Sequence, residues 1–213
     1  MLFGAPRFSF RTTVAPEEML KDAGIPINDQ KARSVGNWSG LVVMQQDTGL
    51  QSSGIDPREF RSALGCFPTG VTIITTLDPR GQCIGITANS FNSVSMDPPL
   101  ILFSLARGAY SMRSFLSTDH FAVNVLSLEQ AELSTRFAKA SADKWAAIDF
   151  ELWDSGCPIL PGCAANFECR TEHTYDGGDH VIFVGRVIRM RHDPAIKPLL
   201  FHQGKYRAVE WSV

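Results

Sequence analysis

The side chains best suited to binding and chemistry gather around a stretch of short hydroxyl and amide residues. Thr87-Ala88-Asn89-Ser90 follows a β-rich run and opens a segment, rich in Ser and Asn, that continues to Asp97-Pro98-Pro99-Leu100. Such a segment leaves backbone N–H groups and small polar side chains available to a ligand. It therefore indicates a site for a flat, polar ring system. Taken alone, the same residues are also typical of a polar turn that satisfies its own backbone.

A second polar segment, Ser104-Leu105-Ala106-Arg107, lies shortly before Ser111 and a predicted helix. A guanidinium binds phosphate through charge-assisted hydrogen bonds, and the first N–H groups of a helix are unpaired. The segment is therefore a candidate phosphate site. The structural alternative is that Ser111 only caps its helix and Arg107 is a solvated surface charge.

The third candidate is His180, which follows Gly177-Gly178-Asp179 and precedes an apolar strand. An imidazole can hydrogen-bond a carboxamide or pass a proton near neutral pH, and Asp179 could set its tautomer. His180 is thus the candidate catalytic residue. The alternative is a tight Gly-Gly turn that carries an exposed histidine. The remaining histidines have no spacing typical of metal ligands, so no metal site is predicted.

The elements that would position these residues are mostly strands. Asp56 before Pro57 predicts the start of a short helix, and Asp78-Pro79-Arg80-Gly81 predicts a hairpin turn. Strands are expected at residues 71–77, 83–87, 100–105, 121–126, 165–173 and 180–191, and helices at 111–116 and 128–140. Many strands joined by hairpins favour an antiparallel barrel over a doubly wound sheet. Asn124 lies within one of these apolar strands, so its amide needs a buried partner or a ligand.

Composition excludes several classes of protein. The 213 residues carry a net charge of -2, which offers no basic field for nucleic acid, and 44% of them are hydrophobic. No apolar run approaches the roughly 18 residues of a membrane helix, and the N-terminus lacks the apolar core of a secretory signal. Five cysteines without a Cys-x-x-Cys pair suit free thiols in a reducing cytoplasm. Neither a Rossmann fingerprint nor a Walker loop is present.

The domain organisation predicted from these patterns has two parts. Residues 1–54 are interrupted throughout by Gly and Pro, which predicts an irregular N-terminal extension. Residues 55–213 hold the strands, the helices and all the candidate residues. We expect them to form a single domain.

Several motifs of this domain resemble the flavin reductase-like family, whose small reductases supply reduced flavin to two-component monooxygenases. They are Phe67-Pro68-Thr69-Gly70-Val71, then Thr-Ala-Asn-Ser with Ser-Val-Ser-x-Asp-Pro-Pro, and finally Gly-Asp-His, in the family's order. The resemblance covers about residues 56 to 209. It implies a mainly β fold with a few helices, an antiparallel Greek-key split β-barrel of the FMN-binding type. It also implies a homodimer whose subunit interface helps to form the flavin site.

The function implied by the resemblance is hydride transfer from NADH or NADPH to FMN or FAD, with the reduced flavin passing to a separate oxygenase. In the family the histidine of the Gly-Asp-His motif faces the nicotinamide side of the flavin, and this position is His180. The predicted cofactor-binding residues are Pro68, Thr69, Thr87, Ala88, Asn89, Ser90, Ser104, Leu105, Ala106, Arg107, Ser111, Asn124, Phe137 and Asp179.

Two rival functions stay open at this point. One is a flavoprotein that keeps FMN and reduces another acceptor, such as a quinone, a metal chelate or an electron carrier. The other is a non-catalytic flavin-binding module. Oxidation of NADH that depends on added flavin would favour the reductase, whereas bound yellow colour without turnover would favour the module.

Overall fold

The computed structural model describes residues 54–139 and 144–209. The predicted N-terminal extension therefore lies outside the described residues, except for Gly54. All described residues belong to one unit, Ser52–Val213.

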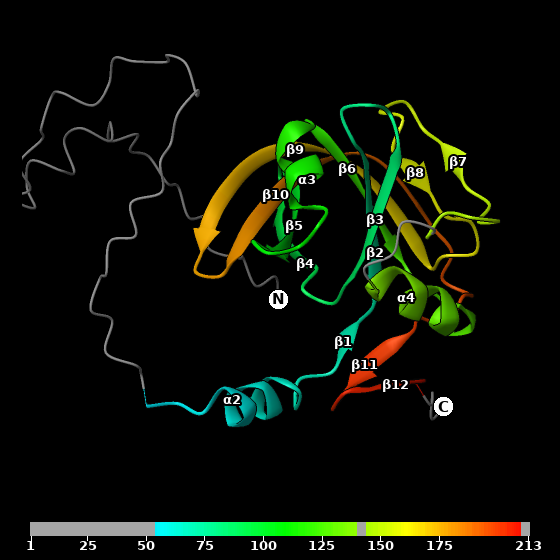
Figure 1. The fold of residues 1–213 in the computed structure, drawn as a ribbon. Helices are drawn as coiled ribbons and strands as arrows, with labels where there is room; N and C mark the ends of the chain where they lie inside the picture. The colour runs from blue at the N-terminus through cyan, green and yellow to red at the C-terminus, as the bar shows by residue number, and fades with distance from the viewer. Residues whose placement is uncertain (1–53, 140–143, 210–213) are drawn as a thin grey trace, which may run out of the picture. The chain divides into compact units, whose positions relative to one another are not determined.

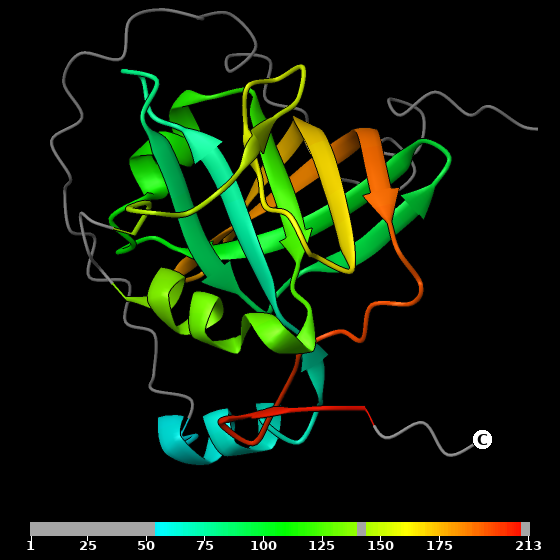
Figure 2. The same cartoon turned by 90° about the vertical axis from the view of Figure 1, so that its right-hand side faces the viewer.

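The main element is a curled antiparallel sheet of seven strands in the order β3-β2-β6-β9-β10-β5-β4 (Figures 1 and 2). Its strands are β2 (Thr72–Leu77), β3 (Cys83–Ala88), β4 (Asn92–Met96), β5 (Pro99–Ala106), β6 (His120–Val125), β9 (Ala165–Gly177) and β10 (His180–His192). The chain passes from β3 at one edge directly to β4 at the other. The predictions of a mainly β, antiparallel fold and of six of these strands are confirmed.

The two edges of the sheet approach each other without pairing their backbones in a ladder. Ser90, just after β3, contacts β5: its Oγ accepts from the Ser104 N–H and donates to the Ser104 carbonyl, both at 3.0 Å. One hydroxyl thus joins the loop after one edge strand to the neighbour of the other. This contact positions the loop that carries the predicted ligand-binding residues.

Aromatic side chains fill the inside of the curled sheet. The Phe103 ring stacks on Phe183 with centroids 5.0 Å apart, and it contacts Phe115 and Phe121 edge to face. All four rings are at most 2% exposed. Phe115 comes from α3 (Met112–Ser117), which therefore packs on this core.

A second apolar cluster lies between the sheet and α4 (Ala131–Ala138), which follows the 3-10 turn η1 (Leu128–Gln130). Phe137 of α4 packs edge to face on Trp145, 4.9 Å between centroids. Gly85 of β3 makes this close approach possible, because a Cβ there would lie 2.5 Å from the Phe137 ring. The predicted helix at 128–140 is thus an η1–α4 pair, and it covers β2 and β3 (Figure 2).

The remaining elements are short. α2 (Pro57–Leu64) begins as predicted, with the Asp56 carboxylate accepting from the Arg58 N–H at 2.9 Å. Two small sheets are formed by β1 (Thr69–Gly70), β11 (Leu200–His202) and β12 (Lys205–Arg207), and by β7 (Glu151–Leu152) and β8 (Pro158–Ile159). Within the described part of the chain, no helix has the length and apolar character needed to cross a membrane.

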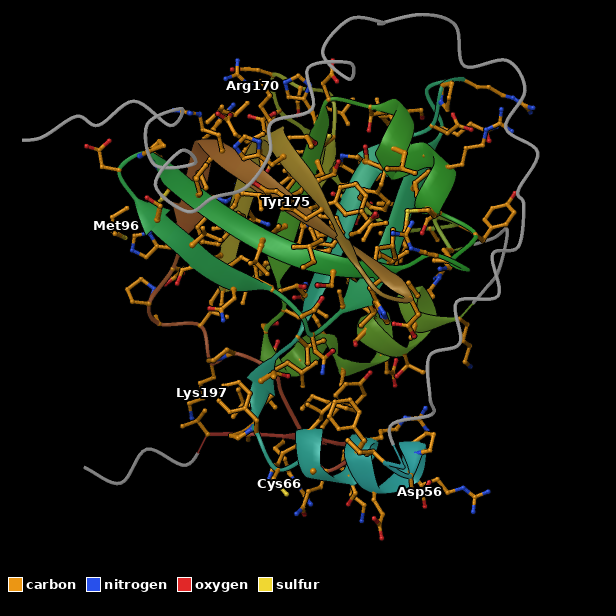
Figure 3. All side chains as sticks on the ribbon, turned by 90° about the vertical axis from the view of Figure 1, so that its left-hand side faces the viewer. Asp56, Cys66, Met96, Arg170, Tyr175 and Lys197 are labelled. Carbon is orange, nitrogen blue, oxygen red and sulfur yellow. The ribbon has the colours of Figure 1, made fainter. Side chains whose placement is uncertain are left out.

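Strand β4 is the one strand of the seven-stranded sheet that the sequence did not predict. It lies within the Ser- and Asn-rich segment read as ligand-binding loop, and four of its five residues are exposed. An edge strand with both faces largely in solvent has no need of alternating apolar residues, so the pattern that marks a half-buried strand is absent. Met96 at the end of β4 is 91% exposed (Figure 3).

Candidate active site

Three of the predicted segments meet where β5 ends and β10 begins. In the register of these two strands Ala106 pairs with His180 and Ser104 pairs with Ile182. Ser90, which follows β3, donates a hydrogen bond to the Ser104 carbonyl. Residues distant in the sequence therefore share one place, as a common ligand would require.

The hydroxyl and amide residues at the end of β3 (Thr87) and just after it (Asn89 and Ser90) differ in which hydrogen-bonding groups remain free for a ligand. The Ser90 hydroxyl already donates its hydrogen to Ser104, and the Thr87 hydroxyl donates to the Ser134 carbonyl of α4 at 2.6 Å. Asn89 is exposed, and its amide makes no hydrogen bond with another described residue. Asn89 is therefore the one side chain of this group with both donor and acceptor free. The other residues can offer a ligand mainly their backbone groups.

His180 and Asp179 form the pair that the sequence suggested. His180 Nδ1 lies 2.7 Å from an Asp179 carboxylate oxygen. This hydrogen bond, with the positive charge of the ring when it is protonated, lowers the pKa of Asp179. The carboxylate therefore stays ionised at neutral pH and favours the hydrogen on Nδ1, which leaves Nε2 facing away from Asp179.

Arg107 is not the freely solvated charge of the structural alternative. Its Nε donates to the Gly178 carbonyl at 3.0 Å, and its Nη2 pairs with the Asp176 carboxylate. Its own backbone N–H donates to the Asp179 carbonyl at 2.9 Å. The guanidinium is thus engaged with the turn between β9 and β10.

Two predicted residues carry buried hydroxyls that have no hydrogen-bond partner among the described residues. Ser111 stands at the N-cap position of α3, yet its side chain makes no capping bond, and its Oγ is buried and unpartnered. The Oγ1 of Thr69, in β1, is in the same state. A buried polar group without a hydrogen bond costs free energy, so both positions fit residues that await a polar ligand. Pro68, next to Thr69, is exposed.

Asn124 and Phe137 are corrections to the predicted site. The Asn124 side chain is 0% exposed, donates to the Ile73 carbonyl, and accepts from the Leu160 N–H and the Asn166 amide. Phe137 is 1% exposed within the cluster beneath α4. Neither side chain has a surface left for a cofactor. The Asn124 amide is therefore satisfied by buried protein groups and not by a ligand, and Phe137 is a packing residue of the core.

Sequence reasoning missed two groups that support the site. Tyr206 of β12 brings its hydroxyl within 2.8 Å of the Ser134 Oγ in α4, and so links the C-terminal hairpin to the helix that holds Thr87. Asp176 pairs with Arg107 across 69 positions of sequence. The sequence does not show either partner, because only the fold brings each residue to it.

Comparisons with known proteins identify the family of this domain. The model of the flavin reductase like domain matches residues 64–210. The chain is 45% identical to the FMN reductase (NADH) SmoA of Agrobacterium fabrum, over 78% of this chain and 93% of that protein. It is 49% identical to a probable flavin reductase of Rhizobium meliloti over 62% of this chain, but it spans only 42% of that protein.

Two solved structures give the same result for the fold. The NADH:FAD oxidoreductase SgcE6 of Streptomyces globisporus, in complex with NAD and FAD fragments, superposes with a TM-score of 0.69 at 37% identity, over 75% of this chain and 98% of that one. The flavin reductase PheA2 superposes with a TM-score of 0.68 at 36% identity, over 74% of this chain and 100% of the other. The antiparallel split-barrel prediction is thereby confirmed. By its motifs, its fold and the match over most of its length, the chain belongs to the family defined by the flavin reductase like domain.

Proposed function

We propose that this protein is an NAD(P)H:flavin oxidoreductase that reduces FMN or FAD. The observation that carries the proposal is the meeting of the loop after β3, the end of β5 and the Asp179–His180 pair at one place in a chain of this family. Relatives named FMN reductase (NADH) and NADH:FAD oxidoreductase support both the reaction and NADH as the donor. Flavin, when bound, supplies an electron-accepting ring that takes up hydride from the nicotinamide.

The residues present fit a flavin through two kinds of group. The free amide of Asn89 and the backbone of Thr87–Ser90 are proposed to bind the polar edge of the ring. The unpartnered hydroxyls of Ser111 and Thr69 are proposed to bind the phosphate or sugar part, together with backbone groups near Ser104 and Ala106. Arg107 already uses its Nε and an Nη group within the protein, which makes Ser111 the better candidate for the phosphate.

His180 is proposed to act on the nicotinamide side of the site. Its Nε2, directed away from Asp179, can accept a hydrogen bond from a carboxamide or hold a proton near the reacting ring. Asp179 keeps the imidazole in one tautomer and one orientation. The protein's part in catalysis is thus to position the donor and the acceptor and to stabilise charge near them.

A separate oxygenase is the proposed partner of this reductase. Relatives are named as reductase subunits, for example HsaB of a flavin-dependent monooxygenase in Rhodococcus jostii, 41% identical over 77% of this chain.

We also propose a homodimer, a cytoplasmic location and a domain boundary near residue 54. The exposed apolar side chains of α2, Phe60 and Leu64, support an interface, and five free thiols support a reducing compartment. Light scattering during gel filtration tests the dimer, because a mass near 23.4 kDa would contradict it.

The experiment that tests the reaction is anaerobic stopped-flow with NADH and NADPH, with FMN and FAD added in turn. Bleaching of the flavin absorbance that scales with added free flavin is the expected result, and it identifies both cofactors. Bound flavin that bleaches with the nicotinamide, does not depend on added free flavin, and regains its colour as another acceptor is reduced would favour the flavoprotein alternative. Bound flavin that never bleaches would favour the binding module and overturn the proposal.

A further inference from the structure

The turn that carries Asp179 and His180 has little packing to hold it in place. Residues 173–179 are all exposed, and the Asp179 side chain is 92% exposed. Gly178 adopts a φ of +72°, and no atom of the described residues lies within 4 Å of the place that a Cβ would occupy. A segment with few buried contacts opens easily unless hydrogen bonds fix it. The strand pairing of His180 with Gly177 and Ala106 fixes its backbone, so the orientation of its side chain depends on the polar contacts of the turn.

Arg107, the residue after β5, supplies three of those contacts from outside the β9–β10 hairpin. Its backbone N–H binds the Asp179 carbonyl at 2.9 Å, its Nε binds the Gly178 carbonyl at 3.0 Å, and its Nη2 pairs with Asp176. The contacts span both arms of the turn, since Asp176 lies on β9 and Asp179 immediately precedes β10. A planar guanidinium with donors in fixed directions can hold a carbonyl and a carboxylate at once.

We propose that Arg107 is a positioning residue that clamps the β9–β10 turn and thereby orients the Asp179–His180 pair, and that it is not a ligand of the flavin phosphate. The inference deepens the proposed function and rests on it, because the purpose of the clamp is to hold His180 toward the nicotinamide. It also explains why an arginine stands here when Ser111 offers an unpartnered hydroxyl for the phosphate.

Two substitutions separate a clamp from a phosphate ligand. Arg107→Lys keeps the positive charge that a phosphate would need but loses the Nε donor and the fork. Asp176→Asn leaves Arg107 intact and weakens only an exposed ion pair, which contributes little by itself. Arg80→Lys is the matched control, because Arg80 is exposed in the turn between β2 and β3.

The kinetic experiment compares FMN with riboflavin, which has the same ring system and no phosphate. We expect Arg107→Lys to lower kcat/KM for NADH by roughly 10- to 100-fold, the usual cost of a misplaced catalytic group, and by the same factor with either flavin. Asp176→Asn should lower it by about two- to fivefold, and Arg80→Lys should not change it. A rise in KM for FMN alone, with riboflavin turnover unchanged, would overturn the clamp and identify a phosphate ligand.

A measurement without substrate keeps the inference separable from the proposed function. The ¹⁵N resonances of the histidine side chains report tautomers, and loss of the His180 signals in His180→Ala assigns them. We expect the wild-type protein to show hydrogen on Nδ1, and Arg107→Lys to move the His180 signals toward the mixed tautomers of free imidazole. Unchanged His180 signals in Arg107→Lys would overturn the clamp, even if the wild-type protein reduced no flavin and the proposed function failed.

Discussion

Side chains that look equivalent in the sequence differ at this site in whether they still have hydrogen-bonding groups to offer. Ser90 and Thr87 have given their hydroxyl hydrogens to Ser104 and Ser134, so they support the site from within. Asn89 and Ser111 retain free groups, one exposed and one buried. The division between supporting residues and ligand-binding residues therefore follows from the partners of each side chain and not from its type.

Asn89→Ala tests the ligand-binding half of this division. We expect flavin affinity to fall by about 1 kcal/mol for each hydrogen bond that the amide makes, with no loss of folding stability. Quenching of flavin fluorescence measures the affinity, and urea unfolding measures the stability. Ser90→Ala is the contrasting variant, because removing the contacts to Ser104 should cost about 1 to 2 kcal/mol of unfolding free energy. Wild-type flavin affinity in folded Asn89→Ala would remove Asn89 from the site.

His180→Ala tests the other half of the site. Turnover with NADH should fall roughly tenfold or more, because general acid–base and hydrogen-bonding groups are lost, while flavin affinity stays near that of the wild type. Steady-state kinetics and flavin titration give the two numbers. His192→Ala, an exposed histidine at the other end of β10, is the control. Equal losses in turnover and in flavin affinity would count against the assignment.

At the scale of elements, β3 is held by the helix that packs on it. The missing side chain of Gly85 leaves room for the Phe137 ring of α4. Two residues further along β3, the Thr87 hydroxyl donates a hydrogen bond to the Ser134 carbonyl of the same helix. Tyr206 of β12 in turn contacts Ser134 of the same helix. The loop that is proposed to bind the flavin ring thus begins at a strand end fixed by α4.

Gly85→Ala tests this contact. A Cβ at position 85 would lie 2.5 Å from Phe137 Cε1 and 3.0 Å from Trp145 Cζ2, so the helix must shift. We expect a loss of about 1 to 3 kcal/mol in unfolding free energy, the usual cost of overpacking, measured by urea denaturation. Gly70→Ala in β1 is the matched control, because nothing lies within 4 Å of its Cβ position. Equal stability of the two variants would show that α4 does not pack on β3 this closely.

The elements also show what sequence patterns can and cannot predict. Strands β2, β5, β6 and β10 were predicted because their apolar residues alternate or run together, as burial on a core requires. β4 was missed because it is exposed on both faces. Asn124 was misassigned for a related reason: a polar residue in an apolar strand signals unmet hydrogen bonds, but the sequence does not show that Leu160 and Asn166 meet them.

At the scale of the whole molecule, the site depends on contacts between segments far apart in the chain. The motifs predicted which segments carry polar groups, and the register of β5 with β10 brings two of them together. The Arg107–Asp176 and Tyr206–Ser134 pairs were beyond prediction, because surface polar residues pair in many ways and only the folded chain selects one. Motifs therefore indicated a candidate site, and the fold shows which of its side chains already have partners and which have hydrogen-bonding groups left.

The five cysteines give a test of the described fold, since they lie at three different depths. Cys66 is exposed after α2 (Figure 3), Cys83 is half-buried, and Cys157, Cys163 and Cys169 are buried. Burial raises the pKa of the Cys163 thiol to about 11 and raises that of Cys169 as well, so few of these thiols are ionised at neutral pH. In a titration with a thiol-reactive chromophore we expect Cys66 to react at once, Cys83 to react slowly, and the other three to react only when the protein unfolds. Cys66→Ser should abolish the fast phase alone. Rapid reaction of Cys163 or Cys169 in the native protein would mean that the clusters which hold β3 and β10 in place are open in solution, and that the geometry of the site depends on the ligand.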